Sequence, residues 1–439
     1  MSNLIKPNEF ARRRRDLMSL MVPNSIAIIA AAPERIRSND TEYRYRQNSD
    51  FYYLTGFNEP EAVLALIPGR RQGQFILFCR DRDPAREIWD GYRAGPQGVV
   101  DHYGADDAFP IGDIDEILPG LIEGRERVYY CVGKEPDFDR QLMEWVNTIR
   151  ARARAGAIPP AEFVDLDHLV HEMRLFKSAA ELKVMARSGK IAARAHCRAM
   201  EVCKPGLFEY QLQAEIEHEF AMAGAEFPAY SSIVGGGANG CILHYIENRA
   251  VLNDGDLVLI DAGCEYQGYA SDITRTFPVN GRFSPEQKVL YNIVLEAQYA
   301  AIDAVRAGNH WNEPHDATVQ VITEGLVDAG LLKGKVADLI EAGAYRDFYM
   351  HRAGHWLGMD VHDAGDYKVD HQWRLLEPGM VMTVEPGLYV APDNANVAEK
   401  WRGIGIRIED NVAITNRGTE ILTSEVPKSI DDIQALMAS

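Results

Sequence analysis

The 439-residue chain lacks several features that would assign it to a membrane, secreted or disulfide-rich class. No apolar run approaches the roughly 20 residues that a membrane-spanning helix needs. A signal peptide is not expected, because Glu9 and four consecutive arginines (12–15) occupy the place of its apolar core. The six cysteines include no CxxC pair, which argues against a disulfide framework and a zinc knuckle. We therefore expect a cytoplasmic protein with no membrane partner.

A basic surface is missing as well. The net charge is −19, so we expect no nucleic-acid partner, since such a partner requires a basic face. With 46% hydrophobic and 25% charged residues, the chain can form a large soluble core. At about 150 residues per domain, its length suggests two to three domains.

Residues 1–172 are predicted to form a smaller α/β domain. The four arginines lie on a predicted helix, and we interpret them as a solvated helix face rather than an anion or partner contact. No phosphate loop or nucleophile elbow is present, which favours a scaffold or interface role. The predicted elements are a helix over 8–21, strands over 25–30, 52–54, 62–67 and 75–79, and helices near 114–121 and 141–152.

Residues 173–439 are predicted to form a second domain with a repeated layout. The capping box at 178–181 opens a long helix that ends near residue 203, and a second box at 284–287 opens another. Further helices are predicted over 210–223 and 316–329. Two helices thus precede each of two sets of strands, which indicates an internally duplicated α/β (α+β) domain.

The stretch 256–277 is predicted to be a hairpin with an apolar first strand. Folding it between Tyr266 and Gln267 places Asp261 opposite Asp272. Like charges on cross-strand partners repel, so one or two divalent cations are expected there, since carboxylate oxygens suit hard metals. The alternative is a longer turn in which both aspartates are solvated loop residues.

Three histidines follow the second pair of predicted helices. His351 and His355 are four residues apart, which puts them on one face of a strand, because side chains alternate with period two. A helix would also bring them together, but Gly354 weakens a helix and the glutamate of the HEXXH pattern is missing. His362 comes shortly afterwards.

The last candidate metal ligands lie on two predicted strands. The segment 379–386 is predicted to be an apolar strand that ends in Glu385 and is terminated by Pro386. The alternating pattern of 404–411 places Arg407 and Glu409 on one face of a second strand. Each glutamate could instead belong to a structural ion pair. Four carboxylates and one imidazole suit a pair of ions such as Mn²⁺, Co²⁺ or Zn²⁺ better than a single ion. The five candidate ligands are Asp261, Asp272, His355, Glu385 and Glu409.

These residues lie in segments that resemble the bacterial-type Xaa-Pro aminopeptidases (aminopeptidase P), which belong to peptidase family M24 and have the pita-bread fold. The resemblance extends from about residue 8 to residue 433, and the N-terminal segment YRQNSDFYYLTGFNEPEAVLALIP takes part in it. The other matching segments are ILHY, DLVLIDAGCEYQGYASDITRTFPVNG, HWLGMDVHDAG, EPGMVMTVEPGLY and RGIGIRIEDN.

The resemblance implies a dinuclear-metal aminopeptidase that releases the N-terminal residue from peptides with proline in second position, with Mn²⁺ favoured. Asp261 would hold one ion, Asp272 and Glu409 would bridge, and His355 and Glu385 would complete the other. A hydroxide between the ions would attack the Xaa-Pro bond.

The resemblance also implies roles for the neighbouring side chains. Glu385 would accept and shuttle a proton, and His362 and His244 would stabilise the oxyanion or bind the substrate backbone. His351 would contact the proline side of the cleft, and Arg407 would orient the bridging carboxylate. Each of these three histidines could instead be a satisfied structural residue.

The family further suggests a homo-oligomer, a tetramer or dimer, in which Trp89 reaches a neighbouring active site. Ordinary core packing is the alternative for that tryptophan. One departure stands out: Arg352 follows the first histidine, where the family usually has a small residue, and this affects the expected shape of the proline subsite.

Two other functions remain open. A prolidase shares the fold and the ligands but accepts only Xaa-Pro dipeptides. A non-catalytic pita-bread binding protein is disfavoured because all five ligands are present.

Overall fold

The computed structural model describes residues 4–439. The chain divides into two compact units, one ending at Arg174 and the other comprising Leu175–Ser439. Within residues 4–439, no helix has both the length and the apolar character needed to cross a membrane.

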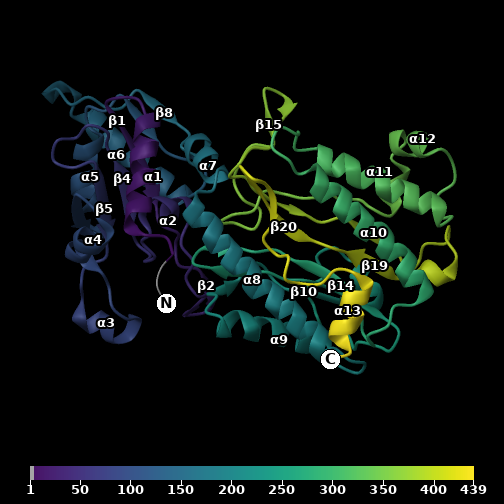
Figure 1. Cartoon of the computed structure of the whole chain (residues 1–439). Helices are drawn as coiled ribbons and strands as arrows, with labels where there is room; N and C mark the ends of the chain where they lie inside the picture. The colour runs from purple at the N-terminus through teal and green to yellow at the C-terminus, as the bar shows by residue number, and fades with distance from the viewer. Residues whose placement is uncertain (1–3) are drawn as a thin grey trace. The chain divides into compact units, whose positions relative to one another are not determined.

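The N-terminal unit is built on a six-stranded mixed sheet with the strand order β6-β5-β4-β1-β7-β8 (Figure 1). Its core lies between this sheet and helices α5 and α6, where side chains such as Ile26, Leu118 and Trp145 pack. The strands are β1 Ser25–Ala30, β2 Ile36–Ser38, β3 Thr41–Glu42, β4 Val63–Leu66, β5 Phe75–Cys79, β6 Asp107–Pro110, β7 Arg127–Tyr129 and β8 Glu162–Val164. The helices are α1 Pro7–Leu20, α2 Ser49–Thr55, α3 Pro84–Asp90, α4 Gly95–Tyr103, α5 Ile114–Ile122, α6 Pro136–Ala151 and α7 Asp167–Leu175.

The strand predicted over residues 52–54 is wrong, because these residues lie in helix α2. The Asn48 side chain accepts a hydrogen bond from the Phe51 backbone N–H at 3.0 Å, which caps the helix. Gly56 ends it in the left-handed conformation with φ 67°. The two caps outweigh the β-propensity of the aromatic residues between them.

The interpretation of the arginine run as a solvated face is wrong for two of its members. Arg13 and Arg14 are 1% and 5% exposed. Their guanidinium groups donate to the backbone carbonyls of Tyr53 and Leu54 at 3.0 and 2.8 Å. They also lie 4.1 and 3.9 Å from the ring centroids of Tyr53 and Phe75, so cation–π contacts hold α1 against the domain.

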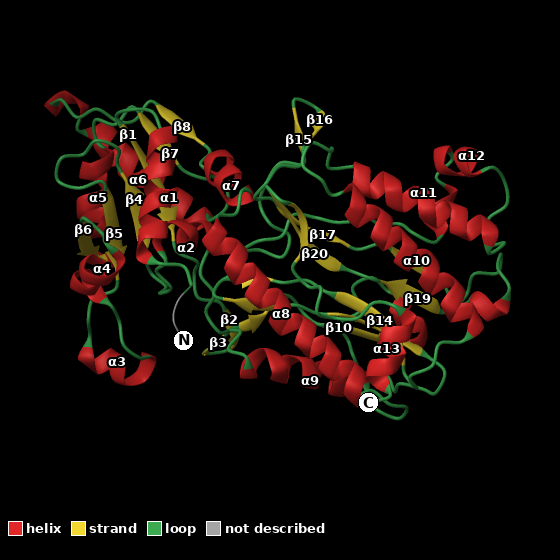
Figure 2. Cartoon of the chain, in the orientation of Figure 1, coloured by secondary structure: helices red, strands yellow, loops and turns green. Residues whose placement is uncertain are grey.

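The C-terminal unit repeats the order of two long helices followed by strands, as predicted. Figure 2 shows the strands between the α8–α9 pair and the α10–α11 pair. The helices are α8 Ala179–Val202, α9 Glu209–Met222, α10 Pro285–Ala304, α11 Glu313–Asp328, α12 Val336–Glu341 and α13 Ile430–Met437. The strands are β9 Phe227–Pro228, β10 Ile233–Gly236, β11 Leu257–Asp261, β12 Cys264–Tyr266, β13 Tyr269–Ala270, β14 Thr274–Pro278, β15 Lys368–Val369, β16 Gln372–Trp373, β17 Val381–Val384, β18 Gly387–Val390, β19 Ile404–Arg407, β20 Asp410–Thr415 and β21 Gly418–Ile421.

The predicted register of the hairpin over 256–277 is wrong by two residues. Tyr266 pairs with Tyr269, and the turn is formed by Gln267 and Gly268, which both have positive φ (51° and 79°). Asp261 therefore pairs with Thr274 rather than with Asp272. Because side chains alternate with period two, a shift of two residues keeps both aspartates on the same face, as diagonal neighbours.

Candidate active site

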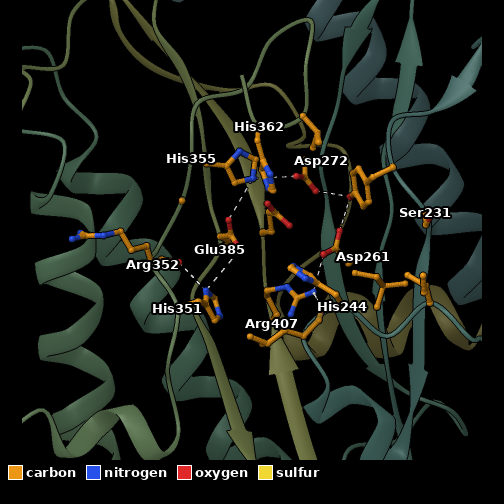
Figure 3. A pocket seen from close by; sticks show the side chains of 17 residues that line it. Ser231, His244, Asp261, Asp272, His351, Arg352, His355, His362, Glu385 and Arg407 are labelled. Carbon is orange, nitrogen blue, oxygen red and sulfur yellow. Dashed lines mark hydrogen bonds and ion pairs between the residues drawn. The ribbon is translucent and has the colours of Figure 1, made fainter. Parts of the chain in front are cut away.

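Nine of the ten residues singled out from the sequence line one cavity of about 470 Å³ in the C-terminal unit (Figure 3). Trp89 is not among the residues that line it. It lies in helix α3 of the N-terminal unit and is 82% exposed, so the alternative of core packing is wrong for this side chain. The nine are His244, Asp261, Asp272, His351, His355, His362, Glu385, Arg407 and Glu409.

Both halves of the unit supply the acidic side chains. Asp261 ends strand β11 and Asp272 lies just before β14, in the first half. Glu385 directly follows β17, and Glu409 lies between β19 and β20, in the second half. Strand ends from the two helix–helix–strand repeats thus meet at this cavity.

A buried tyrosine hydroxyl lies between the two aspartates. The Tyr230 oxygen is 2.5 Å from one carboxylate oxygen of Asp261 and 2.5 Å from one of Asp272. The hydroxyl has a single proton, so it can donate to only one carboxylate at a time. Asp261 and Asp272 are therefore close together, as the sequence predicts. They are diagonal rather than direct cross-strand neighbours, and the Tyr230 hydroxyl lies between their carboxylates.

His355 presents one ring nitrogen to the carboxylates. Its Nδ1 bonds the Trp356 backbone carbonyl at 2.9 Å, which assigns the proton to Nδ1 and leaves Nε2 facing the cavity. Nε2 lies 3.4 Å from Asp272 and 3.6 Å from Glu385. Burial opposes a charge on this ring, but the Asp272 hydrogen bond and the nearby carboxylates outweigh it and raise its pKa to about 9. The residue lies in a loop, so the strand predicted for 350–355 is wrong.

Burial and mutual repulsion disfavour the ionised form of three of the acids. Burial, followed by the charge of Asp272, raises the pKa of Glu385 to about 7, although His355 opposes the rise. The pKa values of Asp261 and Glu409 are raised by the same two causes, that of Glu409 well above its usual value. For Asp272 the opposing contacts prevail: hydrogen bonds with His355 and Tyr230 outweigh burial and lower its pKa.

Arg407 forms its direct ion pair with Asp261, at 2.7 Å, and is 3% exposed. It reaches Glu409 only through Thr274, whose hydroxyl accepts from Arg407 Nε at 3.1 Å and donates to Glu409 at 2.7 Å. The sequence-based role for Arg407 needs this refinement. Thr274 orients Glu409, the carboxylate expected to bridge, and Arg407 orients Thr274.

The remaining histidines lie around the carboxylates. His351 Nε2 is 2.9 Å from the Tyr389 hydroxyl and its Nδ1 is 2.8 Å from the Arg352 carbonyl. Burial and the Arg407 charge lower the pKa of His351 to about 3, so this ring is neutral. His362 lies edge-on to His355 with ring centroids 4.4 Å apart. Arg352 has no positive φ, so a side chain at this position introduces no backbone strain.

The donor set fits divalent cations. Ligand atoms of Asp272, His355 and Glu409 all lie within 4.8 Å of one another. Asp261 and Glu385 add carboxylates to the same cavity. Oxygen donors with a single imidazole suit hard to borderline ions, and the repulsion among the acids would be relieved by positive charge.

The sequence analysis missed Tyr230, which lines the cavity, and two residues behind it that hold its lining in place, Thr274 and Glu209. Thr274 and Tyr230 act through contacts between distant segments, which no local pattern reveals. Glu209 is fully buried at the start of α9 and accepts four hydrogen bonds, from the Gly236 and Ala250 backbone N–H groups, the Asn239 amide and the Tyr245 hydroxyl, at 2.8–2.9 Å. A glutamate followed by a helical pattern indicates only a helix start, so this role leaves no sequence signal.

Comparisons with known proteins agree with this geometry. Residues 183–416 match metallopeptidase family M24, and residues 10–129 match the N-terminal domain of aminopeptidase P. A Xaa-Pro aminopeptidase of Escherichia coli (strain K12) is 51% identical over 436 residues, which cover 99% of this chain and 98% of that protein.

Solved structures agree as well. The structure of Pseudomonas aeruginosa aminopeptidase PepP has a TM-score of 0.98 and 66% identity, covering 99% of this chain and 98% of that one. A zinc-substituted E. coli aminopeptidase P in complex with product has a TM-score of 0.96 and 51% identity, with the same coverage.

The fold and the comparisons define a metallo-exopeptidase, a hydrolase that depends on divalent metal. The chain belongs to metallopeptidase family M24, and its N-terminal domain groups it with the aminopeptidase P enzymes. The resemblance and the pita-bread fold predicted from the sequence are confirmed.

The Glu209 contacts generate a prediction about stability. Glu209→Ala removes a fully buried carboxylate and leaves the partly buried backbone N–H groups of Gly236 and Ala250 without their acceptor, at up to about 1–3 kcal/mol each. We expect a loss of several kcal/mol in the free energy of unfolding, measured by denaturant titration. The matched control is Glu215→Ala on the same helix, whose ion pair with Arg198 is partly exposed and should contribute at most about 1 kcal/mol. Equal effects of the two substitutions would contradict the role of Glu209.

Proposed function

We propose that this protein removes the N-terminal residue from peptides that have proline in second position. The observation that carries the proposal is the convergence of five ligand-type side chains on one cavity within the aminopeptidase P fold. Two divalent cations bound by these residues would supply Lewis acidity and lower the pKa of a water at the site. We expect both cations to be Mn²⁺, since four of the five donors are carboxylates.

The positions of the side chains support the ligand roles that the resemblance implies. Asp261 would hold one cation, with Arg407 fixing one of its oxygens. Asp272 and Glu409 would bridge, and Thr274 would orient Glu409. His355 and Glu385 would complete the second site, with the Nδ1–H of His355 anchored on a backbone carbonyl.

The chain's other residues would handle protons and bind the peptide. Glu385 borders the proposed second cation site and would accept a proton and return it to the leaving amine. His362 and His244 line the cavity and would donate to the developing oxyanion or to the peptide backbone. His351 is neutral and both of its ring nitrogens are hydrogen-bonded, to the Arg352 carbonyl and the Tyr389 hydroxyl, so it would contact the proline side by packing.

We further propose a cytoplasmic homo-oligomer, a tetramer or dimer, with a domain boundary near residue 172. The support for the oligomer is the exposure of Ile88, Trp89 and Tyr92, three large apolar side chains in or next to helix α3, and the division of the chain after Arg174 supports the boundary. Apolar side chains gathered in this way are typical of a contact surface, and Trp89 would reach a neighbouring active site.

Peptide cleavage tests the activity and separates it from that of a prolidase. We expect release of the first residue from an Ala-Pro-Ala tripeptide and from longer Ala-Pro peptides, and no cleavage of Ala-Ala-Ala, measured by product chromatography. Cleavage of the Ala-Pro dipeptide alone would identify a prolidase. Lack of any Xaa-Pro cleavage with Mn²⁺ present would overturn the proposal and favour a binding protein.

Metal removal should abolish activity, and Mn²⁺ should restore it best.

The pKa values of Glu385 and His355, about 7 and about 9, lie above their ordinary values of 4.5 and 6.5. The folded metal-free protein therefore binds more protons than the unfolded chain, so its stability falls as pH rises, between about 4.5 and 7 for Glu385 and between about 6.5 and 9 for His355.

Metal must displace these protons, so the rise in Tm on adding Mn²⁺ to chelator-treated protein should be larger at pH 8 than at pH 6. Thermal unfolding at both pH values, with elemental analysis of the loaded protein, measures this. An equal or reversed shift would contradict the electrostatic description, and full activity of verifiably metal-free protein would refute the metal requirement.

Substitution of ligands should separate metal binding from folding. Asp261→Ala and Glu409→Ala each remove one of the clustered acids, so we expect turnover to fall by several orders of magnitude with loss of metal while the circular dichroism spectrum is retained. Asp254→Ala, at an exposed position on the loop before β11, is the control and should keep full metal content. Wild-type turnover in either ligand variant would remove that residue from the proposed set.

A further inference from the structure

The cavity also contains a cation that the functions assigned above do not use. Arg352 lines it next to His351. Figure 3 shows Arg352 on the His351 side of the cavity, across from Asp261, with its guanidinium directed away from the carboxylates. The residue is exposed.

The Arg352 guanidinium has no acidic partner among residues 4–439. No ion pair within 4.0 Å and no hydrogen bond from this group occurs, although its charge acts on Asp316 of α11. Asp316 accepts a hydrogen bond from the Asn312 amide at 2.7 Å instead. The net charge of the chain is −19, so carboxylates outnumber cations, and yet this arginine at the edge of the cavity pairs with none of them.

An aromatic ring restricts the position of this cation. The guanidinium carbon lies 4.6 Å from the ring centroid of Trp373, on strand β16. Lys368, on the paired strand β15, places its ammonium 4.3 Å from the same centroid. The guanidinium carbon lies over the indole ring, and the N–H donors of this group bond to no other residue among 4–439, so they are available to a planar carboxylate.

The charges of the cavity therefore differ from one side to the other. Carboxylates and their proposed cations lie on one side, His351 lies next to Arg352, and Lys368 adds a second cation beyond. This inference rests on the proposed function, in which the scissile bond lies at the carboxylates and the proline at His351. An extended peptide advances about 3.3–3.6 Å per residue, so the third residue would come within reach of an arginine side chain next to His351.

We propose that Arg352, supported by Trp373 and Lys368, forms a subsite for a negatively charged group after the proline. The group is a carboxylate, supplied either by an acidic side chain at the third position or by the C-terminus of a tripeptide. An exposed ion pair is weak, so the expected preference is about two- to fivefold per charge, in KM rather than in kcat.

Charge-matched peptides test the subsite. Wild-type protein with Mn²⁺ is assayed on the amides Ala-Pro-Glu-NH₂, Ala-Pro-Gln-NH₂ and Ala-Pro-Lys-NH₂, and on Ala-Pro-Gln with a free carboxylate. We expect kcat/KM to fall in the order Glu, Gln, Lys, and the order to flatten in 0.5 M NaCl, because salt screens exposed charges. A gain for free Ala-Pro-Gln over its amide identifies the C-terminal carboxylate as a ligand; a gain for Glu alone identifies the side chain.

Variants assign the preference to the residue. Arg352→Gln should remove the charge preference and keep turnover of Ala-Pro-Gln-NH₂, and Arg352→Lys should restore part of it. Arg417→Gln, at an exposed site on the turn before β21, should keep the wild-type order. A preference that survives in Arg352→Gln, or no preference in the wild type, overturns this inference while the aminopeptidase activity stands. Failure to cleave any of the four peptides overturns the proposed function, and the subsite with it.

Discussion

The arrangement of the C-terminal unit depends on the repulsion among four carboxylates that the fold brings into one cavity. Asp261 and Asp272 come from the first repeat, and Glu385 and Glu409 from the second. Burial and neighbouring charge raise the pKa values of three of them, so the protein alone does not satisfy this cluster. Arg407 and His355 offset only part of the charge. A site that remains unfavourable until cations arrive links metal binding to the stability of the interface between the two repeats.

The loops that carry the histidines are anchored by buried polar contacts in addition to their backbone hydrogen bonds with β17. Lys177 pairs with Asp363 at 2.8 Å, and both side chains are 1% exposed, so the segment after His355 is fixed at its far end. Glu209 accepts hydrogen bonds from the backbone N–H groups of Gly236 and Ala250, and so fixes both ends of the loop that contains His244. Because these anchors are fully paired and lie outside the cavity, they position the histidines without adding charge to the carboxylate cluster.

The sequence predicts best where local rules decide. The capping boxes at Ser178 and Ser284 located two long helices, and both boxes form in the structure. The hairpin register was off by two residues, but the alternation of side chains preserved the face, so the metal hypothesis did not depend on it. Prediction failed where distant contacts decide: residues 350–355 form a loop held against β17, and Tyr230 approaches both aspartates through packing that no local pattern encodes.

The charge distribution also bears on how an exopeptidase could select short peptides. A cavity lined by acids at one side needs positive charge there, supplied by metal and by the amino terminus of a peptide. His351, with a pKa of about 3, adds no charge between that side and Arg352. A free peptide carries opposite charges at its two ends, and the cavity presents the complementary signs in the same order. Electrostatic contacts at both ends would then align a short substrate.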